Sequence, residues 1–227
     1  MKGYIKEIFT SVQGEGIRVG QRQIFIRFFG CNLSCKYCDT PETQRMKGHL
    51  ICGGQEFENP VDIGFVVDQI KEPKVAITGG EPLLQIGFLK GLCQALKAEA
   101  KDIYLDTNGT LPDGLEQVID YLDIVALDFK IPSATGGQQF WSEHERSLRI
   151  SRIKEVFVKM VIDENLKNEE LDKTCEIIKG VDQSIPLVLQ PVFSHDIPNI
   201  LDIQHRASAQ LKDVRIIPQV HKYLKLK

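Results

Sequence analysis

The chain has 227 residues, of which 42% are hydrophobic and 26% are charged, and its formal net charge is −3. This composition allows a packed core and excludes a largely disordered chain, and without a basic block it gives no electrostatic support for direct nucleic-acid binding. The first residues lack the apolar region of a signal peptide, and no apolar run is long enough to span a membrane. We therefore expect a cytoplasmic protein, in a compartment where clustered cysteines more often bind metal or act in catalysis than form disulfides.

Short apolar runs alternate with helical patterns along the chain. The runs are mostly apolar at consecutive positions, which is typical of strands buried on both faces. In chain order, we expect strand 23–28, helix 61–71, strand 74–78, helix 83–100, strand 102–107, strand 123–128, helix 141–153, strand 155–162, helix 168–179, strand 186–190, helix 197–211 and strand 214–217. This alternation predicts a parallel sheet with right-handed crossovers, in a single α/β domain over residues 1–227 that forms a small or open barrel.

Polar or glycine-containing segments follow several of the expected strands. They are residues 78–82, 106–109, 128–130 and 190–193. The carboxyl ends of parallel strands meet at one edge of the sheet, and active sites in parallel α/β folds lie there. The sequence therefore predicts a ligand site at that edge.

Three of the six cysteines lie close together, as Cys31, Cys35 and Cys38 in a C-x3-C-x2-C spacing. Three thiolates on so short a loop can converge on one metal centre. An iron–sulfur cluster held in this way keeps one iron without a protein ligand, so a small molecule can bind there. A tetrahedral zinc site would need a fourth ligand, and His49, the nearest histidine, is not at a usual spacing. A chance grouping of thiols with no shared role is the third alternative.

The other cysteines have different surroundings. Cys93 and Cys175 each lie on the apolar stripe of an expected helix, so we expect both to be core residues. Cys52 precedes two glycines in an expected loop, and we assign it no role.

The cysteine motif after the first expected strand, followed by Gly79-Gly80-Glu81 after the second, resembles the pattern of radical S-adenosylmethionine enzymes. The resemblance implies an abbreviated, incomplete parallel (β/α) barrel whose three clustered cysteines bind a [4Fe–4S] cluster. The amino and carboxylate groups of S-adenosylmethionine would chelate the open iron. Gly79 and Gly80 would let the backbone approach the methionine moiety, and Glu81 would accept a hydrogen bond from its ammonium group.

The same resemblance implies further contacts with S-adenosylmethionine. Tyr37, before the last cysteine, matches the position where the family packs an aromatic ring near the adenine. The remaining expected contacts follow the later strands and are Thr107, Asn108, Lys130 and Gln190.

The flanking segments resemble one family within this superfamily, the 7-carboxy-7-deazaguanine synthases. These segments are residues 9–16, 26–27, 38–40 and 221–224. The resemblance implies conversion of 6-carboxy-5,6,7,8-tetrahydropterin to 7-carboxy-7-deazaguanine with loss of ammonia, a step toward the tRNA bases queuosine and archaeosine. It also implies Mg2+, a homodimer, and a flavodoxin or ferredoxin-type reductant.

The substrate implied by this resemblance is a planar pterin that carries a carboxylate. Arg27 offers a bidentate fork for that carboxylate. Gln13 and Glu15 can meet the amide and amino edge of the pterin. The remaining expected substrate contacts are Gly14 and Gly16, which allow close backbone approach, and His221, which would close the pocket.

Asp39 and Thr40 follow the last cysteine and supply hard oxygen ligands, which suit Mg2+ rather than iron. The resemblance favours Thr40 as the direct ligand. Taken alone, an Asp-Thr pair is equally typical of a turn or a helix cap.

Two segments depart from the synthase pattern, and one of them resembles an alternative, against which residues 13–16, Arg27 and residues 221–224 argue. Residues 105–109 are closer to the third-strand motif of glycyl-radical enzyme activases, and residues 128–130 keep only Lys130 of an expected Ser-Pro-Lys. An activase would consume S-adenosylmethionine and dock a protein loop. An alternative from another class is a non-enzymatic iron–sulfur or zinc module, which would not need the Gly-Gly-Glu motif.

Overall fold

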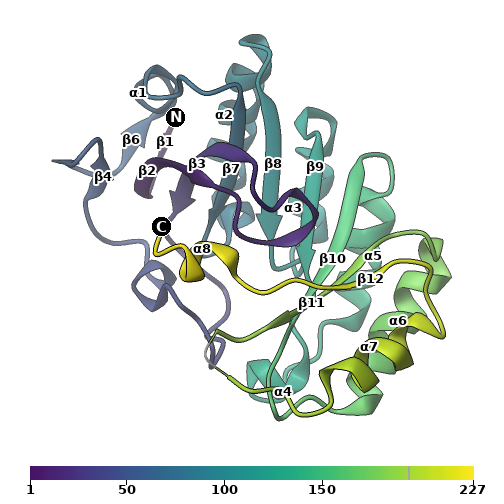
Figure 1. Cartoon of the computed structure of the whole chain (residues 1–227). Coiled ribbons are helices and arrows are strands. Elements are labelled where there is room, and N and C mark those ends of the chain that lie inside the picture. Colours follow the sequence, from purple (N-terminus) through teal and green to yellow (C-terminus); the bar gives the residue numbers. More distant parts are fainter. Residues whose placement is uncertain (194) are drawn as a thin grey trace.

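A computed structural model describes residues 1–193 and 195–227, and a ten-stranded sheet forms its centre (Figure 1). The strand order is β12-β11-β10-β9-β8-β7-β3-β2-β4-β5, so the sheet is curved but open between its two edge strands. The central strands are β2 (Ile5–Val12), β3 (Arg22–Phe28), β7 (Lys74–Gly79), β8 (Asp102–Thr107), β9 (Ile124–Asp128), β10 (Glu155–Ile162), β11 (Leu187–Pro191) and β12 (Val214–Ile216). All neighbouring pairs from β3 to β12 are parallel, which confirms the predicted incomplete parallel barrel.

Helices connect these strands and pack on the outer face of the sheet. They are α1 (Ile63–Asp68), α2 (Ile86–Ala98), α3 (Pro112–Glu116), α4 (Pro132–Thr135), α5 (Trp141–Ser151), α6 (Asn168–Asp182) and α7 (Ile200–Ser208). A short helix, α8 (Val220–Tyr223), follows the last strand and connects no strands. Four short 3-10 turns are η1 (Gly16–Arg18), η2 (Pro41–Gln44), η3 (Pro82–Gln85) and η4 (Ile119–Tyr121). No helix in the described residues is both long and apolar enough to cross a membrane.

The helix predicted over residues 61–71 is shorter than expected at both ends. Val61–Asp62 forms strand β6, which pairs with β1 (Lys2–Gly3), and the Asp62 carboxylate caps α1 by accepting from Phe65 N at 2.9 Å. The helix predicted from residue 197 begins only at Ile200. Both differences lie at element ends, and at the first helix a cap and strand pairing override the apolar pattern.

The sequence patterns did not predict the antiparallel edge of the sheet. Strand β2 runs antiparallel to β3, and β4 (Leu50–Cys52) and β5 (Gln55–Phe57) extend the sheet beyond it. Strand β2 mixes apolar and polar residues without a regular alternation, and it is more buried in its first half than in its second. This edge holds the N-terminal segment beside the carboxyl ends of the parallel strands.

The main core lies between the sheet and the outer helices. It contains both Cys93 and Cys175, which are fully buried, so the prediction that they are core residues is confirmed. A second, smaller cluster fills the concave inner face, with Ala76, Tyr104 and Phe157 among its members. Successive strand residues point to opposite faces, so each central strand contributes to both cores.

Candidate active site

The inner face of the sheet carries an apolar layer and, one step further along the strands, a polar layer. The apolar layer includes Phe25, Ala76, Tyr104, Ala126, Phe157 and Val188. Two residues after each of these, on the same face, stand Arg27, Thr78, Asp106, Asp128, Lys159 and Gln190. All six polar residues line one cavity of about 390 Å³ at the carboxyl ends of the strands. The predicted position of the ligand site is therefore where the cavity lies.

The cysteine loop forms one wall of this cavity. Cys31, Cys35 and Cys38 all line it, and all three are free thiols that are partly exposed. Burial raises the pKa of the Cys31 and Cys35 thiols. Within the described residues, no three His, Cys, Asp or Glu side chains lie close enough together to hold a metal ion without rearrangement.

The Gly79-Gly80 pair anchors the start of the cysteine loop to β7. Gly80 N donates to Phe28 O at 3.0 Å and Glu81 N donates to Gly30 O at 2.7 Å. A Cβ atom on Gly80 would lie 2.2 Å from Gly30 O, and Gly79 has a φ of +141°. Only glycine fits this close approach, so the glycine pair fixes where the first cysteine enters the cavity.

Glu81 lies behind the cavity wall, whereas we expected it to face a ligand. Its side chain is fully buried and is not among the groups that line the cavity. Its carboxylate accepts from Leu83 N at 3.0 Å, from Thr107 Oγ1 at 2.8 Å and from Asn108 N at 2.7 Å. Burial raises the pKa of this carboxyl to about 7, although these hydrogen bonds oppose the rise. In this arrangement Glu81 joins the ends of β7 and β8.

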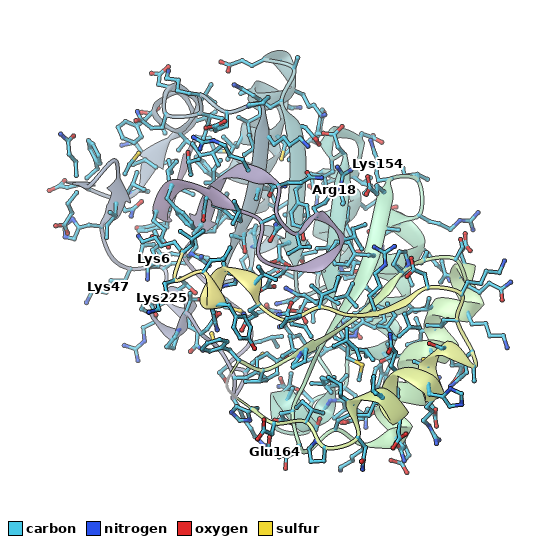
Figure 2. The ribbon with its side chains drawn as sticks, viewed as in Figure 1. Lys6, Arg18, Lys47, Lys154, Glu164 and Lys225 are labelled. Carbon is cyan, nitrogen blue, oxygen red and sulfur yellow. The ribbon has the colours of Figure 1, made fainter. Side chains whose placement is uncertain are left out.

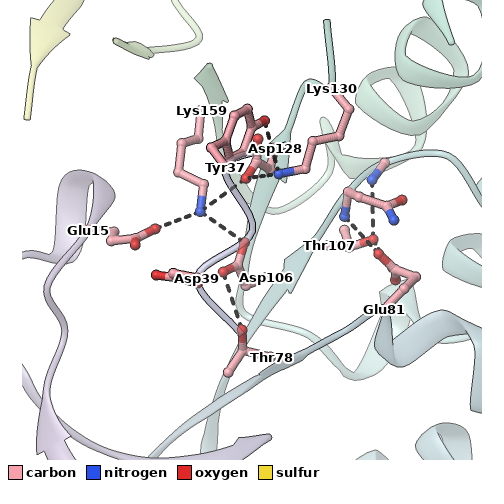
Figure 3. Close-up of polar contacts among 12 residues, drawn as sticks. Glu15, Tyr37, Asp39, Thr78, Glu81, Asp106, Thr107, Asp128, Lys130 and Lys159 are labelled. Atoms are coloured by element: carbon pink, nitrogen blue, oxygen red, sulfur yellow. Dashed lines mark hydrogen bonds and ion pairs between the residues drawn. The ribbon is translucent and has the colours of Figure 1, made fainter. Parts of the chain in front are cut away.

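Buried charges form a network across the floor of the cavity (Figure 3). Lys159 Nζ lies 2.7 Å from Glu15 Oε2, 3.4 Å from Asp128 Oδ2 and 3.5 Å from Asp106 Oδ1. Lys130 Nζ lies 2.7 Å from the same Asp128 oxygen. Burial alone would raise the pKa of the Glu15 carboxyl, but Lys159 outweighs that effect and lowers it to about 2. The floor therefore presents carboxylates that are paired with ammonium groups.

Arg27 lies on the opposite side of the cavity and forms part of a second charged group. Its Nε donates to Glu7 Oε1 at 2.9 Å, and Lys227 Nζ lies 2.6 Å from Glu7 Oε2. Both cations also lie over the Phe9 ring, at 5.7 and 5.4 Å from its centroid. Two cations share one carboxylate here, so this side of the cavity has an excess of positive charge.

The C-terminal segment passes in front of the sheet in Figure 1, beside the N-terminal loop, and its residues Gln219, His221, Lys222 and Lys227 line the cavity. Val220 N donates to Gly14 O at 2.9 Å, and the His221 ring packs so closely on Gly14 that a Cβ there would lie 2.0 Å from Nδ1. Gln219 Nε2 donates to Glu15 Oε1 at 2.8 Å and to Asp39 Oδ2 at 3.2 Å. Lys222 Nζ also lies 3.0 Å from that Asp39 oxygen.

The cavity brings together all the site residues predicted from the sequence except Gly16 and Glu81. Gly16 has a φ of +65°, and a Cβ there would lie 2.2 Å from the Phe157 ring, so this glycine allows close packing beneath the cavity and does not line it. Several further residues line the cavity without an individual role predicted from the sequence. They are Thr78, Asp106, Asp128, Lys159, Gln219, Lys222 and Lys227. Of these, Thr78, Asp106 and Asp128 belong to the polar segments that predicted a ligand site at the strand ends.

Comparison with known proteins gives the family. A family model described as the radical SAM superfamily matches residues 25–178. A 7-carboxy-7-deazaguanine synthase of Geobacter sulfurreducens is 38% identical, over 97% of this chain and 96% of that protein. A synthase of the same name from Archaeoglobus fulgidus is 36% identical, over 99% of both chains. The chain belongs to the 7-carboxy-7-deazaguanine synthase family.

The solved structures agree with the fold of this synthase family. The crystal structure of QueE from Escherichia coli has a TM-score of 0.64 and 20% identity, and the match covers 97% of this chain and 95% of that one. Membership of the family makes the chain a radical S-adenosylmethionine enzyme, which implies a [4Fe–4S] cluster and S-adenosylmethionine as cofactors. The resemblance predicted from the sequence motifs is confirmed, and the activase and the non-enzymatic module are no longer needed as alternatives.

Proposed function

We propose that this chain is a carbon–nitrogen lyase that converts 6-carboxy-5,6,7,8-tetrahydropterin to 7-carboxy-7-deazaguanine with loss of ammonia, in 7-deazapurine biosynthesis. One observation carries the proposal beyond family membership. The three free thiols line the same cavity as the Arg27 guanidinium and the Glu15 carboxylate. A cluster on those thiols would lie beside groups that suit a planar substrate with an anionic end and an N–H-rich edge.

The cysteine loop fits a [4Fe–4S] cluster in its donor set. Cys31, Cys35 and Cys38 are free and line the cavity, and their thiols would lose their protons on binding iron. The raised pKa of Cys31 and Cys35 is a property of the metal-free chain, because a bound metal strongly favours the thiolate. Binding would draw the three sulfurs together from their present positions.

Two orphaned acceptors support a site for S-adenosylmethionine in the cavity. Asp128 Oδ1 and Gln190 Oε1 are buried without a hydrogen-bond partner in the described residues, and both side chains line the cavity. Buried acceptors of this kind need a donor, and an ammonium or ribose hydroxyl would supply one. The Lys130 ammonium lies 5.1 Å from the centre of the Tyr37 ring and fixes that ring beside the cysteines. The Gly79-Gly80 backbone would border the methionine moiety.

Thr107 and Asn108 contribute to the same wall in a more structural way. Thr107 donates to Glu81, and the Asn108 side-chain amide donates to Asn32 Oδ1 at 2.9 Å while its carbonyl oxygen accepts from Thr110. We infer that Glu81 acts through this wall, since it has no surface toward the cavity.

When bound, the cluster and S-adenosylmethionine would supply a 5′-deoxyadenosyl radical, which takes a hydrogen atom from the pterin. The protein's own residues bind, orient and enclose the substrate. Arg27 would take the substrate carboxylate, in competition with its present partner Glu7. Glu15 would accept from the amino edge, and Gly14 and His221 would cover the ring and exclude water. Gln13 holds Glu15, because Gln13 Oε1 accepts from Glu15 N at 3.1 Å.

Thr40 is the better candidate for a direct Mg2+ ligand. Both Asp39 and Thr40 line the cavity, but the Asp39 carboxylate is already bound by Lys222 and Gln219. A hard cation prefers oxygen ligands, and Asp39 would have to release Lys222 before it could bind one. Replacing Thr40 by Ala should therefore weaken Mg2+ dependence more than replacing Asp39 by Asn, as measured by Mg2+ titration of turnover.

Further parts of the proposal concern assembly and partners. We propose that residues 1–227 act as one radical SAM domain, supported by a single sheet that takes strands from Ile5 to Ile216. We also propose a homodimer, as the family resemblance implies. We propose a flavodoxin or ferredoxin-type reductant as well, because the cluster needs an electron from outside the chain.

An anaerobic assay of the reconstituted enzyme tests the function. It should contain 6-carboxytetrahydropterin, S-adenosylmethionine, Mg2+ and a reductant. We expect 7-carboxy-7-deazaguanine to form without net loss of S-adenosylmethionine. Cys38→Ser should abolish cluster absorbance and product, while Cys175→Ser, in the core, should keep the cluster. A fully reconstituted enzyme that binds S-adenosylmethionine and forms no product would contradict the proposal.

A further inference from the structure

Lys159 is a buried charge at a position where the sequence is otherwise apolar. It stands in the middle of β10, between β9 and β11, and is only 5% exposed. Taking an ammonium group out of water costs several kcal/mol unless partners compensate for it. Lys154 immediately precedes the same strand and offers a contrast, because it lies at the outside of the molecule (Figure 2), where its Nζ donates to Asp120 O at 3.0 Å. The cost of burying Lys159 must therefore be compensated by partners within the site.

The three hydrogens of the Lys159 ammonium match three carboxylates. Glu15, Asp128 and Asp106 approach its nitrogen from the N-terminal loop, from β9 and from β8, at 2.7, 3.4 and 3.5 Å (Figure 3). The Lys159 ammonium donates hydrogen bonds to Glu15 and Asp106, and its contact with Asp128 is an ion pair. Its shortest contact is with Glu15, so Lys159 acts on a ligand chiefly through the carboxylates that it holds.

The same partners exclude a nucleophilic role. Burial would lower the pKa of the Lys159 ammonium, but Asp106, Glu15 and Asp128 together raise it well above its usual value. A lysine that forms a Schiff base must be neutral, which requires a lowered pKa. Lys159 stays protonated and acts as a fixed cation.

Lys159 also balances charges that would otherwise repel each other. With Lys130, it sets two ammonium groups against three carboxylates, so the floor of the cavity keeps one excess negative charge. Without Lys159, the carboxylates of Glu15 and Asp106 would face each other without a cation between them. One of them would take up a proton or turn away. Glu15 is the more mobile of the two, because it lies on a loop and Asp106 lies on a strand.

From these contacts we infer that Lys159 is a positioning residue of the substrate pocket. It holds the Glu15 and Asp106 carboxylates at a fixed separation, and so makes the floor an acceptor surface for a ligand edge with several N–H donors. The anionic end of the ligand is directed to the opposite side, at Arg27. This inference rests on the proposed function and adds to it the residue that sets the ligand's orientation.

Three variants of the reconstituted enzyme test the inference. Lys159→Met removes the charge at similar length, Lys159→Arg keeps the charge, and Lys154→Met, immediately before the same strand, is the matched control. We expect Lys159→Met to raise the Kd and KM for the tetrahydropterin at least about tenfold, because a buried charge pair has been broken. The Kd for S-adenosylmethionine should stay within about twofold. Lys159→Arg should recover part of the pterin affinity, and Lys154→Met should match the wild type.

A charge-balanced pair of variants covers the case in which Lys159→Met does not fold. Asp106→Asn is compared with the double variant Asp106→Asn/Lys159→Met, which loses one charge of each sign. We expect the double variant to bind the pterin at least about fivefold more weakly than Asp106→Asn, because Glu15 is no longer held. Equal affinities would show that charge balance alone suffices and would overturn the inference.

Two results separate this inference from the proposed function. If the wild type forms the product and Lys159→Met keeps the wild-type KM for the pterin, the positioning role is wrong and the function stands. If Lys159→Met loses S-adenosylmethionine affinity as strongly as pterin affinity, its role is general to the fold and the inference is again overturned. A wild type that binds S-adenosylmethionine but neither binds nor converts the pterin would overturn both.

Discussion

The Thr107 hydroxyl donates to the buried Glu81 carboxylate at 2.8 Å, and this contact ties the end of β8 to the end of β7. Asn108 N and Leu83 N donate to the same carboxylate. One acidic side chain thus gathers donors from two loops that form adjoining parts of the cavity wall. In the Gly-Gly-Glu motif of this chain, Gly79 and Gly80 therefore line the cavity, whereas Glu81 has a structural role.

Thr107→Val should destabilise the chain while keeping its shape. The valine cannot donate, so the buried carboxylate loses one hydrogen bond, at a cost of about 1–3 kcal/mol. Urea unfolding of the metal-free chain measures this loss. Thr107→Ser keeps the hydroxyl and should cost less, so equal losses in the two variants would argue against the hydrogen bond as the cause.

Because of Glu81, the free energy of unfolding should fall as the pH rises from about 4.5 to about 7. Its pKa in the folded chain is about 7, above the ordinary value of 4.5, because burial disfavours the charged form. Between these values the folded state holds a proton that the unfolded state has lost, so raising the pH favours unfolding. Glu81→Gln should remove this component, although the variant is less stable throughout. His144, whose burial lowers its pKa to about 4, contributes the opposite slope, so the test is the difference between wild type and variant.

That difference is measured by urea unfolding at about pH 5 and about pH 7. We expect the wild type to lose at least about 1 kcal/mol relative to Glu81→Gln between these two conditions. A parallel pH dependence in both proteins would mean that Glu81 is ionised throughout this range.

Gly80→Ala should prevent the cysteine loop from seating against β7. Its Cβ would lie 2.2 Å from Gly30 O and 3.0 Å from Cys31 Cβ, and backbone cannot yield as a flexible side chain can. We expect a loss of about 2 kcal/mol or more and a low iron content after anaerobic reconstitution. Gly114→Ala is the control, because its Cβ would meet Leu83 Cβ at an ordinary 3.5 Å. That variant should incorporate the wild-type amount of iron.

The parallel strands could be predicted from the sequence because they are buried on both faces and therefore read as continuous apolar runs. The same property obscures the role of Lys159, because this residue lies inside such an apolar run and fits the strand pattern. A signal was present, since each of the six polar inner-face residues follows an inner-face apolar residue by two positions, as Asp106 follows Tyr104 and Lys159 follows Phe157. Applying that spacing to every strand would have found the polar layer.

The antiparallel edge and the closing segment had no such local signal. Strand β2 is recognised only through its pairing with β3, which joins residues such as Phe9 and Phe25 across the sheet. Gln219 reaches Glu15 across more than two hundred positions of the chain, and neither residue's neighbours indicate the contact. Contacts of this kind depend on how the whole sheet curves, and periodicity along the chain does not carry that information.

The contact between Gly14 and His221 gives a direct test of whether the C-terminal segment closes the substrate pocket. Gly14→Ala would place a Cβ 2.0 Å from His221 Nδ1, and the His221 ring is the flexible partner, so it should turn out of the cavity. We expect a higher KM for the pterin, an unchanged KM for S-adenosylmethionine and faster proteolysis after residue 218. His221→Ala alone should also raise the KM, because one wall of the pocket is lost.

The double variant Gly14→Ala/His221→Ala distinguishes a clash from a general disturbance of the loop. If the two residues act through their contact, the double variant should be no worse than His221→Ala, because the clash no longer exists. The bond from Val220 N to Gly14 O can then form again, and protection from proteolysis should return. Additive losses in KM would mean that Gly14 and His221 affect the pocket independently of their contact.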